Sequence, residues 1–397
     1  MDTSPAFAGL DCVDCGERFD PETATHRCPE CGGILDPAYE LGSLDLSQDD
    51  IESRPFDSIW RYDDLLPFPR SAAVTMGEGG TPLVDCPRLA DELGVGRVVF
   101  KDEGQNPTGT FKDRGHSAAL SAAVGHGAEE IALPSAGNAG QAGAAYAARA
   151  GLPAHVFLPS RAGFTMKAMV NVHGGDLTVV EGGIGDAGAA CTEALAEHPE
   201  WYSTATFQTP YRHEGKKTML FEIVEQLDWE VPDAVVYPTG GGVGLVGMHK
   251  AAMEFKELGL IDTLPPMYAA QSTGCAPIVE AWETGKAVHE VWEHPDTICG
   301  GIEIPDPGAS PLILEAMRES DGGAVATTDD EILEGAITVA QQEGLEMIPT
   351  AAAAASGTIK LAQEGEFGPD DTVVILNTGA GNKSADVLRS HLMSHGV

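Results

Sequence analysis

Residues 106–115 read NPTGTFKDRG and predict a turn that leads directly into a helix. Pro107 and Gly109 preset the backbone of this turn. They place Lys112 beside the ring of Phe111, at the point where the helix begins. A partly apolar pocket near a helix N-terminus disfavours the cationic form of a lysine, and the neutral amine is the form that attacks a carbonyl. The segment therefore predicts that Lys112 forms a Schiff base.

Two further loops each follow a predicted strand and open a helix. Residues 135–140 read SAGNAG, and free backbone N–H groups at such a helix start make a site for an anion, such as a carboxylate. Residues 239–244 read TGGGVG, where consecutive glycines allow the backbone to wrap a phosphate with the helix dipole behind it. No Lys-Ser or Lys-Thr follows, and the spacing misses the dinucleotide fingerprint, which disfavours both classes of nucleotide site.

Short apolar runs alternate with longer, alanine-rich segments from about residue 95 onward. Runs that are apolar throughout predict buried parallel strands, and the segments between them have helical spacing. The expected strands are 97–100, 130–133, 154–158, 177–180, 234–237, 268–271 and 372–376, and the clearest helices are 137–150, 243–258 and 329–343. This alternation predicts an α/β fold with helices on both faces of parallel sheets.

Four of the eight cysteines form two Cys-x-x-Cys pairs near the start of the chain, with twelve residues between the pairs. The pairs are Cys12 with Cys15 and Cys28 with Cys31. This spacing bends the backbone so that both pairs reach one tetrahedral metal, and four thiolates suit a structural Zn²⁺. Two disulfides are the alternative, which a reducing cytosol disfavours. The polar, acidic residues 36–60 that follow have the composition of a connector.

The charge balance limits the possible partners. The chain has 23 Lys and Arg against 61 Asp and Glu, a formal net charge of −38. A field of that sign repels phosphate backbones and anionic lipid surfaces, so we expect no nucleic-acid or membrane partner. Acidic residues spread along the whole chain are typical of a surface adapted to concentrated salt, with a merely acidic enzyme as the alternative. Without a signal segment or an apolar run of about 18 residues, a cytoplasmic protein is expected.

In order and content these motifs resemble those of the fold-type II pyridoxal-phosphate (PLP) enzymes, and specifically those of the threonine synthases. The similarity covers essentially the whole chain. The motifs that carry it are the cysteine pairs, residues 77–83 (GEGGTPL), 106–115, 135–140, 212–216 (RHEGK), 240–244 and 377–381 (NTGAG). The resemblance implies a tryptophan synthase β-like fold with two parallel-sheet domains, preceded by the zinc ribbon.

The same resemblance implies a role for individual residues. Lys112 would carry PLP and act as the catalytic acid and base. The cofactor contacts would be Lys112, Phe111, Asn138, Gly240, Gly241, Gly242, Val243, Gly244 and Thr378. The substrate contacts would be Thr81, Ser135, Ala136, Gly137, Ala139, Gly140 and Arg212. The neutral hydroxyl of Thr378 would face the ring nitrogen of PLP and leave it largely unprotonated. An unprotonated ring withdraws electrons less strongly, which would favour elimination over transamination.

Domain organisation is implied in the same way. Residues 1–45 would form the zinc ribbon and connector, and residues 46–114 with 204–397 the large PLP-binding domain. Residues 115–203 would form a small α/β domain inserted between the two parts of the large one. A homodimer is expected from the family.

The implied reaction converts O-phosphohomoserine and water into L-threonine and phosphate. Two departures from the family pattern keep alternatives open, namely Thr206-Phe207 where many members have Asn-Ser, and a glycine loop like that of dehydratase relatives. The main alternative is a related lyase or replacement enzyme, such as a serine/threonine ammonia-lyase or a cysteate synthase. A binding protein without catalysis is the third possibility.

Overall fold

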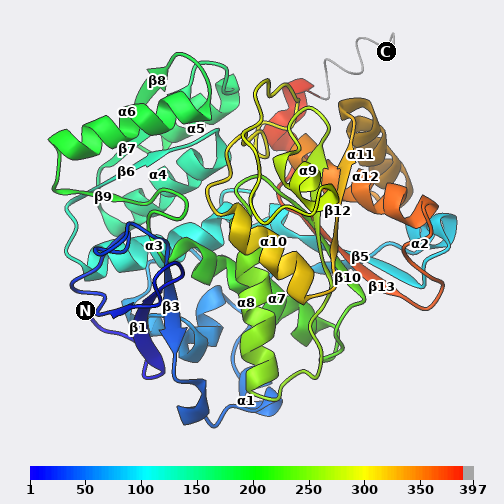
Figure 1. Ribbon diagram of the computed structural model, residues 1–397, viewed down its shortest axis with the longest axis horizontal. Helices are drawn as coiled ribbons and strands as arrows, with labels where there is room; N and C mark the ends of the chain where they lie inside the picture. Colours follow the sequence, from blue (N-terminus) through cyan, green and yellow to red (C-terminus); the bar gives the residue numbers. More distant parts are fainter. Residues whose placement is uncertain (388–397) are drawn as a thin grey trace.

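The computed structural model describes residues 1–387, which fold into two α/β layers and a small antiparallel ribbon at the N-terminal end (Figure 1). The larger sheet has the strand order β12-β11-β10-β13-β5-β4 and the smaller one β8-β7-β6-β9. The ribbon has the order β2-β1-β3. The strands are β1 Phe7–Cys12, β2 Arg18–Phe19, β3 Leu35–Tyr39, β4 Leu83–Asp85, β5 Arg97–Asp102, β6 Glu130–Pro134, β7 Ala154–Pro159, β8 Asp176–Val180, β9 Trp201–Ser203, β10 Ala234–Pro238, β11 Met267–Ser272, β12 Gly323–Thr327 and β13 Thr372–Asn377.

Helices connect the strands and cover both faces of the two α/β sheets (Figure 1). The α-helices are α1 Gln48–Glu52, α2 Pro87–Leu93, α3 Lys112–Gly125, α4 Asn138–Ala150, α5 Phe164–Val172, α6 Ile184–Glu197, α7 Arg212–Gln226, α8 Val243–Glu257, α9 Pro277–Glu283, α10 Ser310–Glu319, α11 Asp329–Glu343 and α12 Pro349–Gln363. Short 3-10 helices are η1 Leu41–Ser43, η2 Ile59–Leu65, η3 Arg70–Ala72, η4 Glu103–Gln105 and η5 Gly381–Ser384. In the described part of the chain no helix is long and apolar enough to span a bilayer.

The seven strands and three helices expected from the sequence are all present, with ends that differ by at most two residues. One feature of the larger sheet corrects the prediction. Its edge strand β4 runs antiparallel to β5, so this sheet is mixed, whereas the smaller sheet is parallel throughout. The chain turns back through the short helix α2, which ends at Gly94 with a φ of 69°. A three-residue edge strand carries no periodic pattern from which its direction could be predicted.

Strand β13 illustrates why the central strands are apolar at every position. Val374 and Leu376 pack into the core shared with α7, α8 and α10. Val373 and Ile375 point to the opposite face and pack against α11 and α12. Successive side chains alternate between faces, so a strand buried on both sides must be apolar throughout. The smaller sheet is covered in the same way, by α4 on one face and α6 on the other.

The N-terminal ribbon is packed against the rest of the chain. Leu10 and Leu35 of the ribbon share a core with Trp60 of η2 and Tyr211, which precedes α7. Residues 36–39, expected to belong to a connector, instead form most of β3. The Oδ1 atom of Asp36 lies 2.6 Å from Nε2 of His213 on α7. His213 therefore contacts the ribbon and does not line the cavity described below.

Candidate active site

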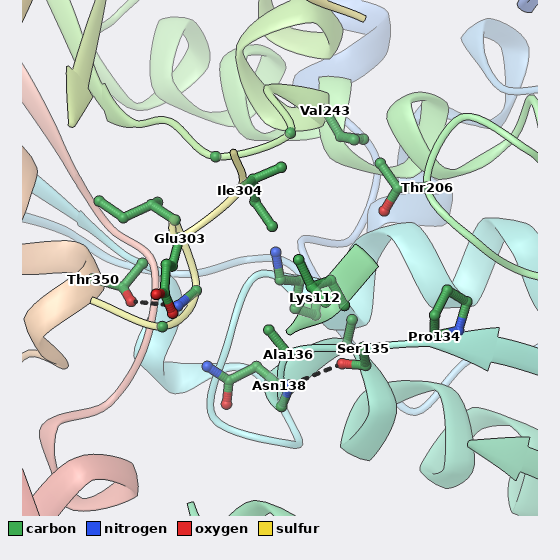
Figure 2. Close-up of a pocket in the computed structure, with 18 of the residues that line it drawn as sticks. Lys112, Pro134, Ser135, Ala136, Asn138, Thr206, Val243, Glu303, Ile304 and Thr350 are labelled. Atoms are coloured by element: carbon green, nitrogen blue, oxygen red, sulfur yellow. Dashed lines mark hydrogen bonds between the residues drawn. The ribbon is translucent and has the colours of Figure 1, made fainter. Parts of the chain in front are cut away.

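A cavity of about 1070 Å³ opens between the two α/β layers, where β6, β10 and β13 end. This is the position at which open parallel sheets bind their ligands. Figure 2 shows Lys112 extending from the start of α3 into the middle of the cavity, with Val243 and Thr206 on one side. Ser135 and Asn138 lie on the opposite side (Figure 2). The motifs that are far apart in the sequence therefore meet in one place.

The environment of Lys112 matches the chemistry expected of a Schiff-base lysine. Burial, followed by the positive charge of Arg212, lowers the pKa of Lys112 to about 7. Its Nζ lies 4.2 Å from the centroid of the Phe111 ring, which borders the cavity. A large fraction of this amine is therefore neutral near pH 7, and the neutral form can attack an aldehyde.

Two polar atoms of uncharged side chains in the cavity wall lack a hydrogen-bond partner. Among residues 1–387, the buried Oδ1 of Asn138 and Oγ1 of Thr378 form no hydrogen bond. Buried polar groups are nearly always satisfied, so such atoms indicate a missing ligand. Both residues line the cavity that contains Lys112. An aromatic ring with a polar substituent and a ring nitrogen, as in PLP, would satisfy both atoms, so the residues present fit this cofactor.

The glycine loop supplies an anion site next to Lys112. Gly240, Gly241, Gly242 and Val243 line the cavity, and α8 begins at Val243. Gly242 has a φ of 69°, and a Cβ there would lie 2.2 Å from Cδ1 of Ile313. Gly244 lies behind the loop, where a Cβ would approach the hydroxyl of Tyr237 to 2.4 Å. Side chains are excluded at both positions, which leaves the helix N-terminus open to a phosphate.

The serine loop holds its own shape through one side chain. The Oγ of Ser135 accepts hydrogen bonds from the N–H groups of Gly137, at 2.9 Å, and Gly140, at 2.7 Å. Ser135, Ala136, Gly137 and Ala139 line the cavity, whereas Gly140 is packed behind them against Val156. Helix α4 begins at Asn138, and the first N–H groups of a helix have no partner within it. Those N–H groups at the start of α4 that are not already bonded to Ser135 can donate hydrogen bonds to a carboxylate.

Arg212 enters the cavity from the first residue of α7 and is only 1% exposed. Its Nη1 donates to the carbonyl oxygen of Thr204 at 3.2 Å and to Oγ1 of Thr206 at 3.0 Å. The pair Thr206-Phe207, which departs from the family pattern, therefore contributes a hydroxyl that holds Arg212. Phe207 stacks on His213 with 5.7 Å between ring centroids.

Thr81, the other expected phosphate contact, lies outside the cavity lining. It is buried in a group of charged side chains that we call the paired cluster, Lys101, Glu103, Arg114 and Glu222. Its Oγ1 donates to Glu103 at 2.7 Å and accepts from Nη2 of Arg114 at 3.1 Å. In this structure the Thr81 hydroxyl is thus engaged away from Lys112.

The cavity also contains residues that the sequence motifs did not single out. Lys216, one helical turn after Arg212, lines the wall next to Phe111. His26 and Arg27 of the ribbon line the same cavity, which brings the N-terminal segment to the edge of the site. Glu303 and Ile304, which follow Gly300 and Gly301 but belong to none of the motifs quoted above, face Lys112 (Figure 2). Lys216 follows Arg212 by four residues, a spacing that would place both side chains on one face of a helix, and this was the available indication for Lys216.

The four N-terminal cysteines lie together, as their spacing predicts. Their sulfur atoms are all within 4.8 Å of one another. The Sγ atoms of Cys12 and Cys31 are 3.5 Å apart, and those of Cys15 and Cys28 are 3.7 Å apart. Sulfurs that bind one tetrahedral zinc at 2.3 Å are roughly 3.8 Å apart, so the donor set and its geometry fit this ion.

Comparisons with known proteins agree with this geometry. The family model described as "Pyridoxal-phosphate dependent enzyme" matches residues 74–379. Among solved structures, the chain is similar to a threonine deaminase from Solanum lycopersicum, with a TM-score of 0.68 and 21% identity over 80% of this chain and 88% of that one. Maize serine racemase gives a TM-score of 0.66 at 21% identity, covering 80% and 94% of the two chains. These similarities confirm the predicted fold-type II architecture.

Comparison with curated sequences identifies a more specific family within the PLP-dependent enzymes. A threonine synthase of Methanosarcina acetivorans is 38% identical over 93% of this chain and 91% of its own length. A threonine synthase of Methanocaldococcus jannaschii is 36% identical over 94% of this chain and 93% of its own length. This chain therefore belongs to the PLP-dependent enzymes and, within them, to the threonine synthase family.

Proposed function

We propose that this enzyme converts O-phosphohomoserine and water into L-threonine and phosphate. The observation that carries the proposal is that one cavity holds both Lys112, whose amine suits a covalent cofactor, and Arg212, whose guanidinium suits a phosphate. Family membership at 36–38% identity to threonine synthases supports it. The bound cofactor supplies an electron-withdrawing ring that acidifies the carbon-bound hydrogens of the substrate.

The residues around the cavity would move protons and hold the cofactor. Lys112 would hold the cofactor through its amine, and the same amine would take the Cα proton of the substrate and move protons at the β and γ carbons. Asn138 would bond the ring oxygen of the cofactor, and Thr378 would present a neutral hydroxyl to the ring nitrogen. Phe111 would border the ring, and Gly240, Gly241, Gly242, Val243 and Gly244 would hold the cofactor phosphate.

The substrate is held at its two charged ends. The serine loop, from Ser135 to Gly140, takes the carboxylate at the start of α4. Arg212 takes the phosphate that leaves Cγ, while water adds at Cβ. Contact between Thr81 and the phosphate stays a prediction, because the Thr81 hydroxyl is engaged with Glu103 and Arg114.

The wider organisation follows from the same proposal. Residues 115–203 form a small domain that closes on the substrate, between the two parts of the large domain, 46–114 and 204–397, of which residues 388–397 lie outside the described residues. Residues 1–45 form a ribbon and connector, in which Cys12, Cys15, Cys28 and Cys31 bind a structural zinc. We further infer a cytoplasmic homodimer whose acidic surface is adapted to concentrated salt.

A paired assay on the PLP-loaded enzyme in concentrated KCl tests the function. Phosphate and threonine should appear in equal amounts from O-phosphohomoserine, and 2-oxo acid should not form rapidly from threonine or serine. Lys112→Ala should reduce the rate by at least about 10⁴-fold, because it removes the group that moves the protons. Oxo acid without phosphate would instead assign the enzyme to the ammonia-lyases.

A further inference from the structure

Lys216 is a buried lysine of the cavity to which no role has been assigned. It lies on α7 four residues after Arg212, so the two side chains share one face of the helix. Lys216 is 1% exposed and lines the cavity. Its Nζ lies 4.6 Å from the centroid of the Phe111 ring, and Nζ of Lys112 lies 4.2 Å from the same centroid. We call Lys112, Arg212 and Lys216 the cation group.

The cation group has no counter-ion in the part of the chain that the structure describes. Across residues 1–387, no carboxylate forms an ion pair with any of its members. Arg212 donates only to neutral oxygens, of Thr204 and Thr206. Glu303 lines the same cavity but is paired with Arg161 at 2.9 Å. Burial, and then the charges of Lys112 and Arg212, lower the pKa of Lys216 well below its usual range.

An unpaired buried cation costs several kcal/mol unless an anion joins it. A cavity that keeps Arg212 and Lys216 beside the catalytic lysine without a carboxylate is therefore suited to an anion, which would stabilise the protonated form of Lys216. A phosphate group carries close to two negative charges and has several acceptor oxygens. Its oxygens can meet the planar fork of Arg212 and the compact ammonium of Lys216 at the same time.

We propose that Lys216, together with Arg212, binds the phosphate group of the substrate and so determines specificity for a phosphorylated amino acid. The assignment rests on the proposed function, which supplies the phosphate-bearing substrate. Serine and threonine have no such group, so they would leave Lys216 buried and uncompensated. Leaving a site's buried polar groups unpaired is an effective way to reject a smaller analogue.

Binding of inorganic phosphate to the PLP-loaded enzyme provides the test. We would titrate phosphate into the wild type and Lys216→Met by calorimetry in constant KCl. The expected result is a Kd at least about tenfold higher in Lys216→Met, with unchanged visible absorbance and affinity of the cofactor. Lys216→Arg, which keeps the charge, should stay within about threefold of the wild type. Lys256→Met removes an exposed lysine from α8 and should bind phosphate normally.

Steady-state kinetics add a second readout. Lys216→Met should raise KM for O-phosphohomoserine more than it lowers kcat, because the lost contact is made before chemistry begins. Equal phosphate affinity in Lys216→Met and the wild type would overturn the proposal. A loss of cofactor affinity with unchanged phosphate affinity would overturn it as well, because Lys216 would then serve the cofactor.

The outcomes also separate this proposal from the proposed function. If phosphate binding depends on Lys216 but no threonine forms, the reaction is wrong and the anion site stands. If threonine forms with the same KM in Lys216→Met and the wild type, the reaction stands and the role of Lys216 is wrong.

Discussion

The paired cluster and the cation group are both buried and both include residues of α3 and α7, yet only the paired cluster has its charges balanced by partners within the protein. In the paired cluster, Arg114 meets Glu103 and Glu222 at 2.7 Å, and Lys101 meets Glu222 at 2.7 Å. In the cation group no described carboxylate meets any of the three cations. A buried cluster in which every charge has an oppositely charged partner stabilises a fold. A group of basic side chains that faces a cavity without such partners indicates a ligand. The comparison thus separates structural charges from functional ones.

The largest expected effect is on stability. Arg114→Met should lower the free energy of unfolding by about 3–5 kcal/mol, because the buried Glu103 loses its ion pair and Glu222 keeps only the one with Lys101. Lys216→Met should leave that free energy unchanged or raise it by about 1–2 kcal/mol, because it replaces an amine buried without a counter-ion by an apolar side chain. Chemical unfolding of the cofactor-free proteins in the same KCl concentration measures both. A large loss of stability in Lys216→Met would show that Lys216 has a counter-ion and would break the comparison.

A smaller effect is expected within the cation group. Arg212→Gln should lower kcat/KM for O-phosphohomoserine by roughly 10- to 150-fold, the worth of a charged hydrogen bond of about 1.5–3 kcal/mol. Thr206→Val only removes the hydroxyl that holds Arg212 at 3.0 Å, so its loss should be several times smaller. Initial rates over a range of substrate concentrations measure both variants. Identical losses would mean that Thr206 contacts the substrate itself.

The smallest expected effect concerns pH. The pKa of Lys112 is lowered to about 7, so its neutral amine predominates above pH 7 and not only above the usual value near 10.4. The cofactor-free protein should therefore capture PLP at a rate that rises through about pH 7 and then levels off. Trapping the adduct with borohydride at a series of pH values measures this midpoint. A midpoint above pH 9 would show that the site does not depress the pKa of Lys112.

The sequence predicted the parts of the molecule that depend on local pattern. Strands buried on both faces are continuously apolar, which is why β5, β10 and β13 could be located from the sequence. The loop motifs placed Lys112, Asn138 and Thr378, which the structure brings into one cavity. The Cys-x-x-Cys pairs likewise bring four sulfurs together.

What the sequence did not reveal depends on contacts between distant segments. Thr81 lies in a conspicuous motif, but its hydroxyl bonds to Glu103 and to Arg114 of α3. Lys216 was part of a quoted motif, yet its position beside Phe111 depends on how α7 packs against α3. Arg27 reaches the cavity only because the ribbon docks on the enzyme body. No local spacing encodes any of these three contacts.

The most direct test of the central claim follows the oxygen atoms of the reaction. We would incubate the PLP-loaded enzyme with O-phosphohomoserine in water enriched in heavy oxygen and analyse both products by mass spectrometry. Elimination at Cγ followed by addition of water at Cβ predicts one heavy oxygen in the threonine and none in the phosphate. Heavy oxygen in the phosphate, with homoserine as the other product, would show simple hydrolysis of the phosphate ester and would contradict the account.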